Sequence, residues 1–283
     1  MSLNKILYLF AFTALTCFSQ QAEPIQRIIS LAPSITDTLY TLGVEHKLVG
    51  ITSFCPQPKS GRKIVSVGNM NPSLEALLVL KPDLVITLHS DKRTLDNLKK
   101  AGVRTLSIRN QSLASIYDSY IKLGGICGVD KAALKLRSQT KEKFAKLATT
   151  HQDTQQKTLI LISRLSSSPG KIAPWAASNK SFYGEILSGL KGHSAITSDK
   201  CFYQLSAEEL IQSNPDIIII LGPIALSKKA QDAEIKAWQI LSSLSAVRKQ
   251  EIHFITNAHI MIPGPKIQES MKDFSKVLQQ ASP

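Results

Sequence analysis

The sequence SLEALLVLKPDLVI at residues 73–86 returns in altered form as SAEELIQSNPDIII at residues 206–219. Ser, Glu, Pro and Asp match between the two copies at a constant offset of 133 residues. Each copy predicts a capped amphipathic helix, a break at Pro-Asp and a buried strand. Two similar halves, each with a Glu at the start of a helix, indicate two lobes that face a common cleft or partner. This organisation favours a binding protein over a single-site enzyme.

Alternating strand and helix patterns extend outward from the two copies. Strand-like apolar runs occur in both halves, at residues 27–31, 48–52, 84–88, 103–108, 158–162, 217–221 and 251–256. Strands that alternate with helices form parallel sheets, so we expect an α/β fold of two lobes with mostly parallel sheets and flanking helices. Helical periodicity over residues 130–150 predicts one long helix that bridges the lobes. The predicted units are an N-terminal lobe (23–128), a linking helix (129–155) and a C-terminal lobe (156–283).

The first 22 residues predict a cleavable signal peptide. Lys5 supplies a positive charge, and the uncharged stretch that follows, residues 6–18, is too short to span a bilayer. Small residues at Ser19 and Ala22 offer cleavage sites. A lipid anchor on Cys17 is the weaker alternative. Lipoprotein signals place a Leu three residues before the Cys, whereas Leu15 lies only two residues before Cys17. We therefore predict secretion to the periplasm.

Composition is that of an ordinary globular protein, with 43% hydrophobic and 19% charged residues over 283 positions. This length is sufficient for two lobes with their own cores. The net charge is +13, but Lys and Arg are scattered rather than clustered. We interpret them as a solvated basic surface, and expect a monomer with no nucleic-acid partner.

Enzymatic and metal-binding motifs are missing from the sequence. It contains no Walker A, GxSxG, HExxH or GxGxxG pattern, so we expect neither an enzyme nor a resident cofactor. Three cysteines follow the predicted signal peptide: Cys55, Cys127 and Cys201. They form no CxxC pair, and their odd number leaves at least one thiol free or paired outside the chain. Six scattered histidines do not indicate a site for free metal ions.

A group of short motifs resembles the periplasmic binding proteins for cobalamin and ferric siderophores. RIISLAPSIT at residues 27–36 and LVGIT at 48–52 carry the resemblance, and NPSLE at 71–75 strengthens it. The sequence PGPK at 263–266 is similar to the family's Pro-Gly-Pro-Arg, with Lys266 in place of Arg. The resemblance implies two α/β lobes joined by one long helix, with the ligand held between them. It also implies docking on the permease of an ABC importer, which works with an ATPase.

The resemblance gives the two repeated carboxylates a role. Glu75 and Glu208 match the positions that meet arginines of the permease, whereas Glu209 lies outside the repeat register. The residues alone permit a second interpretation, because a carboxylate in a first helical turn is stabilised by the helix dipole. Both interpretations place the two side chains at helix starts.

Candidate ligand-contacting residues follow from the rule that ligands bind at the carboxyl ends of parallel strands. Four are aromatic and would form a sparse aromatic cleft that suits a large macrocycle. Two are histidines, which either bond within loops or ligate a metal carried by the ligand. The predicted contacts are Phe54, Trp175, Phe202, Tyr203, His89 and His259.

The predicted ligand is a metal chelate, with cobalamin or another corrinoid as the first choice. Haem or a ferric siderophore is the alternative. Arg164 and Lys266 could meet the charges of an anionic siderophore. Lys266 nevertheless counts against one, because an ammonium is a point charge whereas the guanidinium of the family's usual Arg is a bidentate fork. Free metal-ion binding and a surface adhesion protein on the same scaffold remain as further alternatives.

Overall fold

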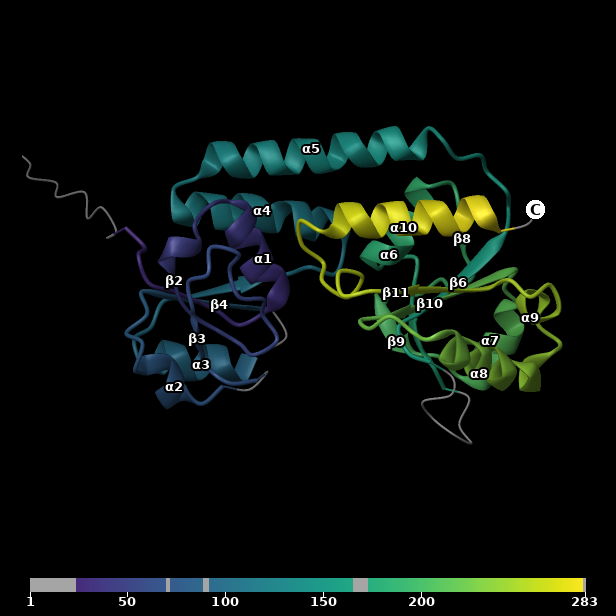
Figure 1. The fold of residues 1–283 in the computed structure, drawn as a ribbon, viewed down its shortest axis with the longest axis horizontal. Coiled ribbons are helices and arrows are strands. Elements are labelled where there is room, and N and C mark those ends of the chain that lie inside the picture. The colour runs from purple at the N-terminus through teal and green to yellow at the C-terminus, as the bar shows by residue number, and fades with distance from the viewer. Residues whose placement is uncertain (1–23, 70–71, 89–91, 165–172, 282–283) are drawn as a thin grey trace, which may run out of the picture.

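The computed structural model describes residues 24–69, 72–88, 92–164 and 173–281 (Figure 1). The predicted signal peptide with Cys17, and the candidate contact His89, lie outside these residues. The predicted α/β class is confirmed, since the chain forms two separate sheets with helices around them. In the described part of the chain, no helix has the length and apolar character needed to cross a membrane.

The N-terminal sheet is entirely parallel, with the strand order β3-β2-β1-β4-β5. The central strands β1 and β4 are buried, which explains their continuous apolar runs. The elements of this lobe are β1 (Ile28–Ser30), α1 (Pro33–Thr41), the 3-10 helix η2 (Glu45–Lys47), β2 (Leu48–Ile51), β3 (Val65–Ser66), α2 (Leu74–Leu78), β4 (Leu84–Leu88), α3 (Lys92–Lys100) and β5 (Thr105–Ile108).

Two long helices follow, α4 (Leu113–Cys127) and α5 (Asp130–Ala148). The sequence suggests a helix break near Gly124 and Gly125, yet α4 continues through both and ends at Gly128. A Cβ on Gly124 would lie 2.3 Å from the Cβ of Ala133, so this glycine permits the close approach of α4 and α5. Helix α5 runs from above the first sheet to above the second, as expected for the linking helix (Figure 1).

The C-terminal sheet has the order β11-β10-β6-β7-β9, with β8 also paired to β6. Its β6, β8, β10 and β11 pair in parallel, whereas β7 pairs antiparallel with both β6 and β9, so the sheet is mostly parallel, as predicted. The elements are β6 (Lys157–Leu161), β7 (Trp175–Ala177), α6 (Phe182–Gly189), β8 (His193–Ser194), β9 (Phe202–Gln204), α7 (Ala207–Ser213), β10 (Ile217–Gly222), α8 (Lys228–Trp238), the 3-10 helix η4 (Gln239–Leu241), α9 (Ser245–Arg248), β11 (Ile252–Thr256) and α10 (Ile267–Gln280).

The repeated sequence forms the same local structure in both lobes. The hydroxyl oxygens of Ser73 and Ser206 accept hydrogen bonds from backbone N–H groups and cap α2 and α7. Lys81 and Asn214, each just before the Pro, have left-handed backbones with φ of 44° and 36°. Helix α2 is short, Leu74–Leu78, because this turn begins soon after Leu78.

The Asp of each copy joins the helix-strand turn to the neighbouring central strand. Asp83 Oδ2 accepts hydrogen bonds from the backbone N–H groups of Gln26 and Arg27, at 2.9 and 2.8 Å, beside β1. Asp216 Oδ2 accepts one from the N–H of Lys157 on β6, at 3.1 Å. The Pro-Asp pair is therefore a structural joint that fixes where β4 and β10 begin.

The largest buried cluster extends from the first sheet through α4 and α5 to α6 and α10 of the second lobe. Tyr183 and Phe274 stack within it, with ring centroids 6.0 Å apart. The three described cysteines are free thiols; Cys55 and Cys127 are buried and Cys201 is half-buried. Burial raises the thiol pKa of Cys127 and of Cys201, which favours the unreactive protonated form.

Candidate ligand-binding site

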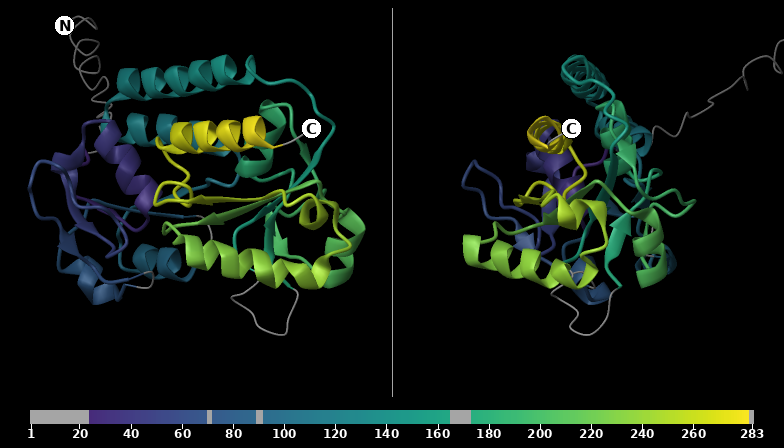
Figure 2. Two further views of the ribbon diagram at one scale, coloured as in Figure 1. Left: turned by 45° about the vertical axis from the view of Figure 1, so that its right-hand side comes forward. Right: turned by 90° about the vertical axis from the view of Figure 1, so that its right-hand side faces the viewer.

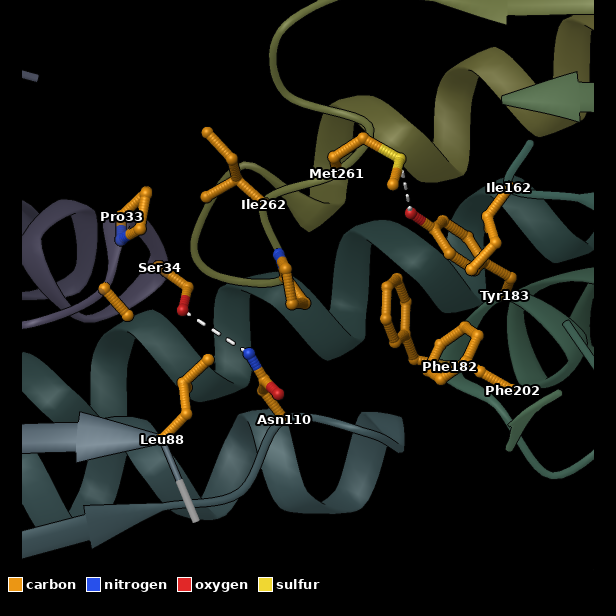
Figure 3. A pocket seen from close by; sticks show the side chains of 12 residues that line it. Pro33, Ser34, Leu88, Asn110, Ile162, Phe182, Tyr183, Phe202, Met261 and Ile262 are labelled. Carbon is orange, nitrogen blue, oxygen red and sulfur yellow. Dashed lines mark hydrogen bonds between the residues drawn. The ribbon is translucent and has the colours of Figure 1, made fainter. Parts of the chain in front are cut away.

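A pocket of about 280 Å³ lies between the two lobes (Figure 3). It collects residues that follow the carboxyl ends of β1, β4, β5 and β6, where ligands bind in parallel α/β sheets. Its lining is almost wholly apolar and has no charged side chain among the described residues. The lining residues are Ala32, Pro33, Ser34, Leu88, Asn110, Ile162, Phe182, Tyr183, Phe202, Met261, Ile262 and Pro263.

The C-terminal lobe supplies an aromatic wall made of Phe182, Tyr183 and Phe202 (Figure 3). Phe182 and Tyr183 begin α6, just after its N-cap Ser181, and Phe202 begins β9. The Phe202 ring meets the other two edge-on, with centroids 6.0 and 6.1 Å away. Such edge-to-face contacts hold the rings in fixed orientations, so this wall is preformed.

The buried hydroxyl of Tyr183 is tied to the segment that closes the pocket. It donates a hydrogen bond to the carbonyl of Ile260, and it lies 3.7 Å from the Sδ of Met261. Burial raises the pKa of Tyr183, so the phenol stays neutral at physiological pH. The Tyr183 hydroxyl therefore positions Met261 over the pocket and does not present a charge to a ligand.

The N-terminal lobe supplies two polar side chains to the described lining, Ser34 and Asn110. Ser34 lies in the first turn of α1, and Asn110 Nδ2 donates a 3.4 Å hydrogen bond to its Oγ (Figure 3). Leu88 and Pro33 complete this wall. The pocket thus has two faces of different chemistry, one aromatic and one mixed aliphatic and amide.

The segment after β11 crosses from the second lobe back to the first. Tyr120 donates its hydroxyl hydrogen to the carbonyl of Gly264, with 2.9 Å between the oxygens. A Cβ on Gly264 would lie 3.1 Å from the carbonyl oxygen of Ser34, so a larger residue would push the segment off α1. Lys266 then forms an ion pair with Asp37 of α1, with 3.2 Å between Nζ and Oδ1. This segment is a second connection between the lobes, besides α5.

Of the predicted aromatic contacts, Phe202 lines the pocket and Trp175 borders it. Trp175 was expected in a loop but begins β7, and its carbonyl accepts a 2.9 Å hydrogen bond from the N–H of the lining residue Ile162. Phe202 pairs with Ala177 across the ladder, so alternation puts Trp175 on the same sheet face as Phe202. Trp175 is 47% exposed and Phe54, after β2, is 60% exposed, which leaves both rings free for contact.

Tyr203 and His259 lie away from the pocket lining. Tyr203 follows Phe202 in β9, and adjacent strand residues face opposite sides, so Tyr203 lines a different hollow with Glu209. His259 Nε2 pairs with Asp273 Oδ2 of α10 at 2.7 Å. Tyr203 therefore faces away from the pocket, and the His259 ring is already engaged by the carboxylate of Asp273.

The carboxylates of Glu75 and Glu208 are exposed at the starts of α2 and α7. Among the described residues neither forms an ion pair, whereas Glu209 closes the capping box of α7 with Ser206. Both helices lie at the end of the molecule opposite α5, one on each lobe (Figures 1 and 2). Two exposed carboxylates, neither in an ion pair among the described residues, thus lie on helices of separate lobes at this end of the molecule.

A model of the periplasmic binding protein family matches residues 28–258, most of the chain. The chain belongs to this family. An uncharacterized ABC transporter substrate-binding lipoprotein of Bacillus subtilis, YvrC, is 27% identical over 90% of this chain and 80% of its own length. A vitamin B12-binding protein of Vibrio parahaemolyticus is 25% identical over 93% of each chain. The family resemblance predicted from the sequence motifs is therefore confirmed.

Solved structures of such proteins share the two-lobed architecture. A possible iron-binding, periplasmic solute-binding protein from Staphylococcus epidermidis superposes with a TM-score of 0.76 and 27% identity, over 90% of this chain and 99% of the other. Substrate-binding proteins of ABC transporters work with a permease and an ATPase, so the chain is the solute-binding part of such a system.

Several pocket residues were missed by the sequence reasoning. Ile162 directly follows β6 and Asn110 lies two residues after β5, so the strand-end rule would have found them had it been applied to every strand. Phe182 and Tyr183 lie at a helix start instead, and no strand precedes them closely enough to signal a role. Only the packing of α6 against the pocket brings them to the ligand side.

Proposed function

We propose that this periplasmic binding protein captures cobalamin, or a related corrinoid, between its lobes and delivers it to an ABC importer. The observation that carries the proposal is a pocket whose described lining has an aromatic wall and no charged side chain. A corrin ring presents a broad face and amide side chains. Aromatic rings suit the face, and the amide of Asn110 suits polar groups at the ligand edge.

The absence of a charged side chain from the described lining argues against an anionic ferric siderophore. Burying its carboxylate or catecholate charges without a basic partner would cost several kcal/mol or more, as a rough estimate for unpaired charges. The nearest cation on the closing segment, Lys266, is already paired with Asp37. Haem, with a flat face and two carboxylates, is the alternative ligand.

The pocket volume of about 280 Å³ is at or below the lower end of typical ligand sites, so a macrocycle must also use surface outside it. Phe54 and Trp175, both at strand ends and both largely exposed, are suited to hold the parts that extend out of the pocket. This arrangement predicts contact with both lobes at once, and hence one ligand per chain.

The test is calorimetric titration of the mature protein with cyanocobalamin, haem and a panel of ferric siderophores. We expect one-to-one binding of cyanocobalamin, accompanied by a change in Trp175 fluorescence, and weaker or no binding of the siderophores. Binding of haem with no binding of cyanocobalamin would contradict the ligand assignment and leave the pocket intact. If none of these compounds bound, the proposal that the ligand is a metal chelate would lose its support.

We further propose that Glu75 and Glu208 dock on the permease, in agreement with the family resemblance. Replacing both with Ala should leave cyanocobalamin affinity unchanged and lower uptake by about tenfold or more, because charged interface pairs steer and orient the complex. The matched control is Asp130→Ala with Glu142→Ala on α5, which removes the same charge from the opposite end of the molecule. Equal uptake by both double variants would refute the docking assignment.

A further inference from the structure

Each docking helix exposes an aliphatic side chain one turn after its carboxylate. Val79, the C-cap residue of α2, follows Glu75 by four residues and is 77% exposed. On α7, Ile211 follows Glu208 by three residues and is 49% exposed. Residues three or four apart share one face of a helix, so each lobe presents a carboxylate and an apolar group side by side.

Packing within the lobes does not account for the apolar character of Val79 and Ile211. They belong to the short list of large hydrophobic residues that the described chain leaves exposed, while Leu77 and Leu210 on the same helices are fully buried. The buried leucines anchor α2 and α7 to their lobes, and Val79 and Ile211 point to solvent. An isolated exposed aliphatic group is common, but here it accompanies an unpaired carboxylate on both copies of the repeat.

We propose that Val79 and Ile211 are permease contacts, and that each lobe docks through a carboxylate and an aliphatic group together. The partner surface then carries, at two places, a basic residue beside an apolar recess. Charge complementarity supports this partner, because Glu75 and Glu208 are unpaired among the described residues of a chain with a net charge of +13. The inference rests on the proposed docking role of the two carboxylates.

The carboxylates and the aliphatic side chains should contribute to different steps of binding to the permease. Carboxylate pairs at an exposed rim act over roughly a Debye length and are weakened by salt. Burial of an aliphatic group depends little on ionic strength and slows dissociation. The apolar pair therefore supplies residence time after the carboxylates have oriented the encounter.

The experiment measures binding of the ligand-loaded protein to its importer in lipid nanodiscs, at low and at high salt. The variants are Glu75→Ala with Glu208→Ala, Val79→Ser with Ile211→Ser, and the control Leu134→Ser. Leu134 lies on α5 and is 49% exposed, the same value as Ile211. Cyanocobalamin titration and thermal melting of each variant verify the pocket and the fold.

We expect the apolar double variant to bind the importer about tenfold or more weakly, by an amount that persists at high salt, through faster dissociation. The carboxylate variant should lose binding mainly at low salt, and Leu134→Ser should match the wild type. Normal binding by the apolar variant would overturn this inference while the carboxylate result still stood. If neither double variant changed binding, both the docking role and the inference would fail.

Photo-crosslinking gives an independent measurement that needs no loss of affinity. Benzoylphenylalanine at position 79 or 211 should form an adduct with a permease subunit in cells, and the same group at position 134 should not. The adduct should disappear when Glu75 and Glu208 are replaced by Ala. An adduct from position 134 alone would place the permease on the opposite end of the molecule and overturn the inference.

Discussion

The two lobes share a framework but differ in the walls that they present to the pocket. Both contain a Ser-capped short helix, a left-handed residue before Pro, and an Asp that accepts backbone N–H groups beside the central strand. Yet the first lobe offers Pro33, Ser34, Leu88 and Asn110, and the second offers aromatic rings. The difference teaches that the repeat maintains the scaffold and the helices that carry Glu75 and Glu208, while the pocket surface depends mainly on residues outside the repeat.

The strongest test of this comparison replaces one side chain on each wall of the pocket with Ala. Phe202→Ala should weaken cyanocobalamin binding about 10- to 100-fold, because a ring buries more area than an aliphatic group and orients the macrocycle. Leu88→Ala, on the opposite wall, should weaken it about fivefold. Both side chains are half-buried, so the two variants are matched in exposure. Titration calorimetry decides, and equal losses would show that the walls contribute alike.

The shared framework can be tested at its two Asp residues. Asp83→Ala and Asp216→Ala should each lower the free energy of unfolding by about 1–3 kcal/mol, because backbone N–H groups lose a charged acceptor. Asp216 also accepts from Ser245 Oγ at 2.9 Å, which makes its hydrogen bonds equal in number to those of Asp83, and it lies 3.8 Å from Lys249 Nζ, so its loss should be the larger. Urea denaturation followed by circular dichroism measures both. A loss at only one site would show that the two turns are not equivalent joints.

The ion pair between Lys266 and Asp37 is one of the contacts that join the segment after β11 to the first lobe. Lys266→Ala should destabilise the protein by about 1 kcal/mol, a value limited by the 48% exposure of the lysine side chain. Lys266→Arg should retain the stability or increase it, because a guanidinium fork can also reach Asp37 Oδ2, which is buried without a hydrogen-bond partner among the described residues.

Melting temperatures of the two Lys266 variants give the measurement. The control is Lys272→Ala, which breaks a more exposed pair with Glu269 and should change stability by a few tenths of a kcal/mol. A Lys266→Ala variant no less stable than this control would mean that the ion pair does not join the lobes.

The smallest expected effect concerns His151, which follows α5 and pairs with Ser275 Oγ of α10 at 2.7 Å. Burial lowers the pKa of His151 below the ordinary value of 6.5, so protonation favours the unfolded chain. Its contribution to stability is therefore complete above the unfolded pKa and is lost as the pH falls through 6.5 toward the folded value.

His151→Gln should accordingly make the protein's stability depend less on pH between neutral and mildly acidic conditions. His46→Gln, on the exposed η2 helix, serves as the control for removing one histidine. Denaturation curves over that pH range measure the slope for both variants. An unchanged slope in His151→Gln would exclude His151 as the group responsible.

Much of the fold could be predicted because it depends on local patterns. Apolar runs bounded by turn residues identified every buried parallel strand, and Ser-x-Glu identified the starts of α2 and α7. The antiparallel strands β7 and β9 were missed, since three-residue strands carry too short a pattern to distinguish from a loop. That miss explains the Tyr203 prediction, because only the strand alternation shows that Tyr203 and Phe202 face opposite ways.

The sequence by itself determined the two-lobed α/β class, the duplicated turn and the carboxylates at its helix starts. These features follow from hydrophobic periodicity, capping and backbone preferences, which act over a few residues. Only the tertiary structure decided which side chains meet at the pocket. Phe182, Met261 and Asn110 are far apart in the chain, and their meeting depends on how α6, the segment after β11 and the first sheet pack together. Packing between distant elements is set by the whole core, so no local pattern records it.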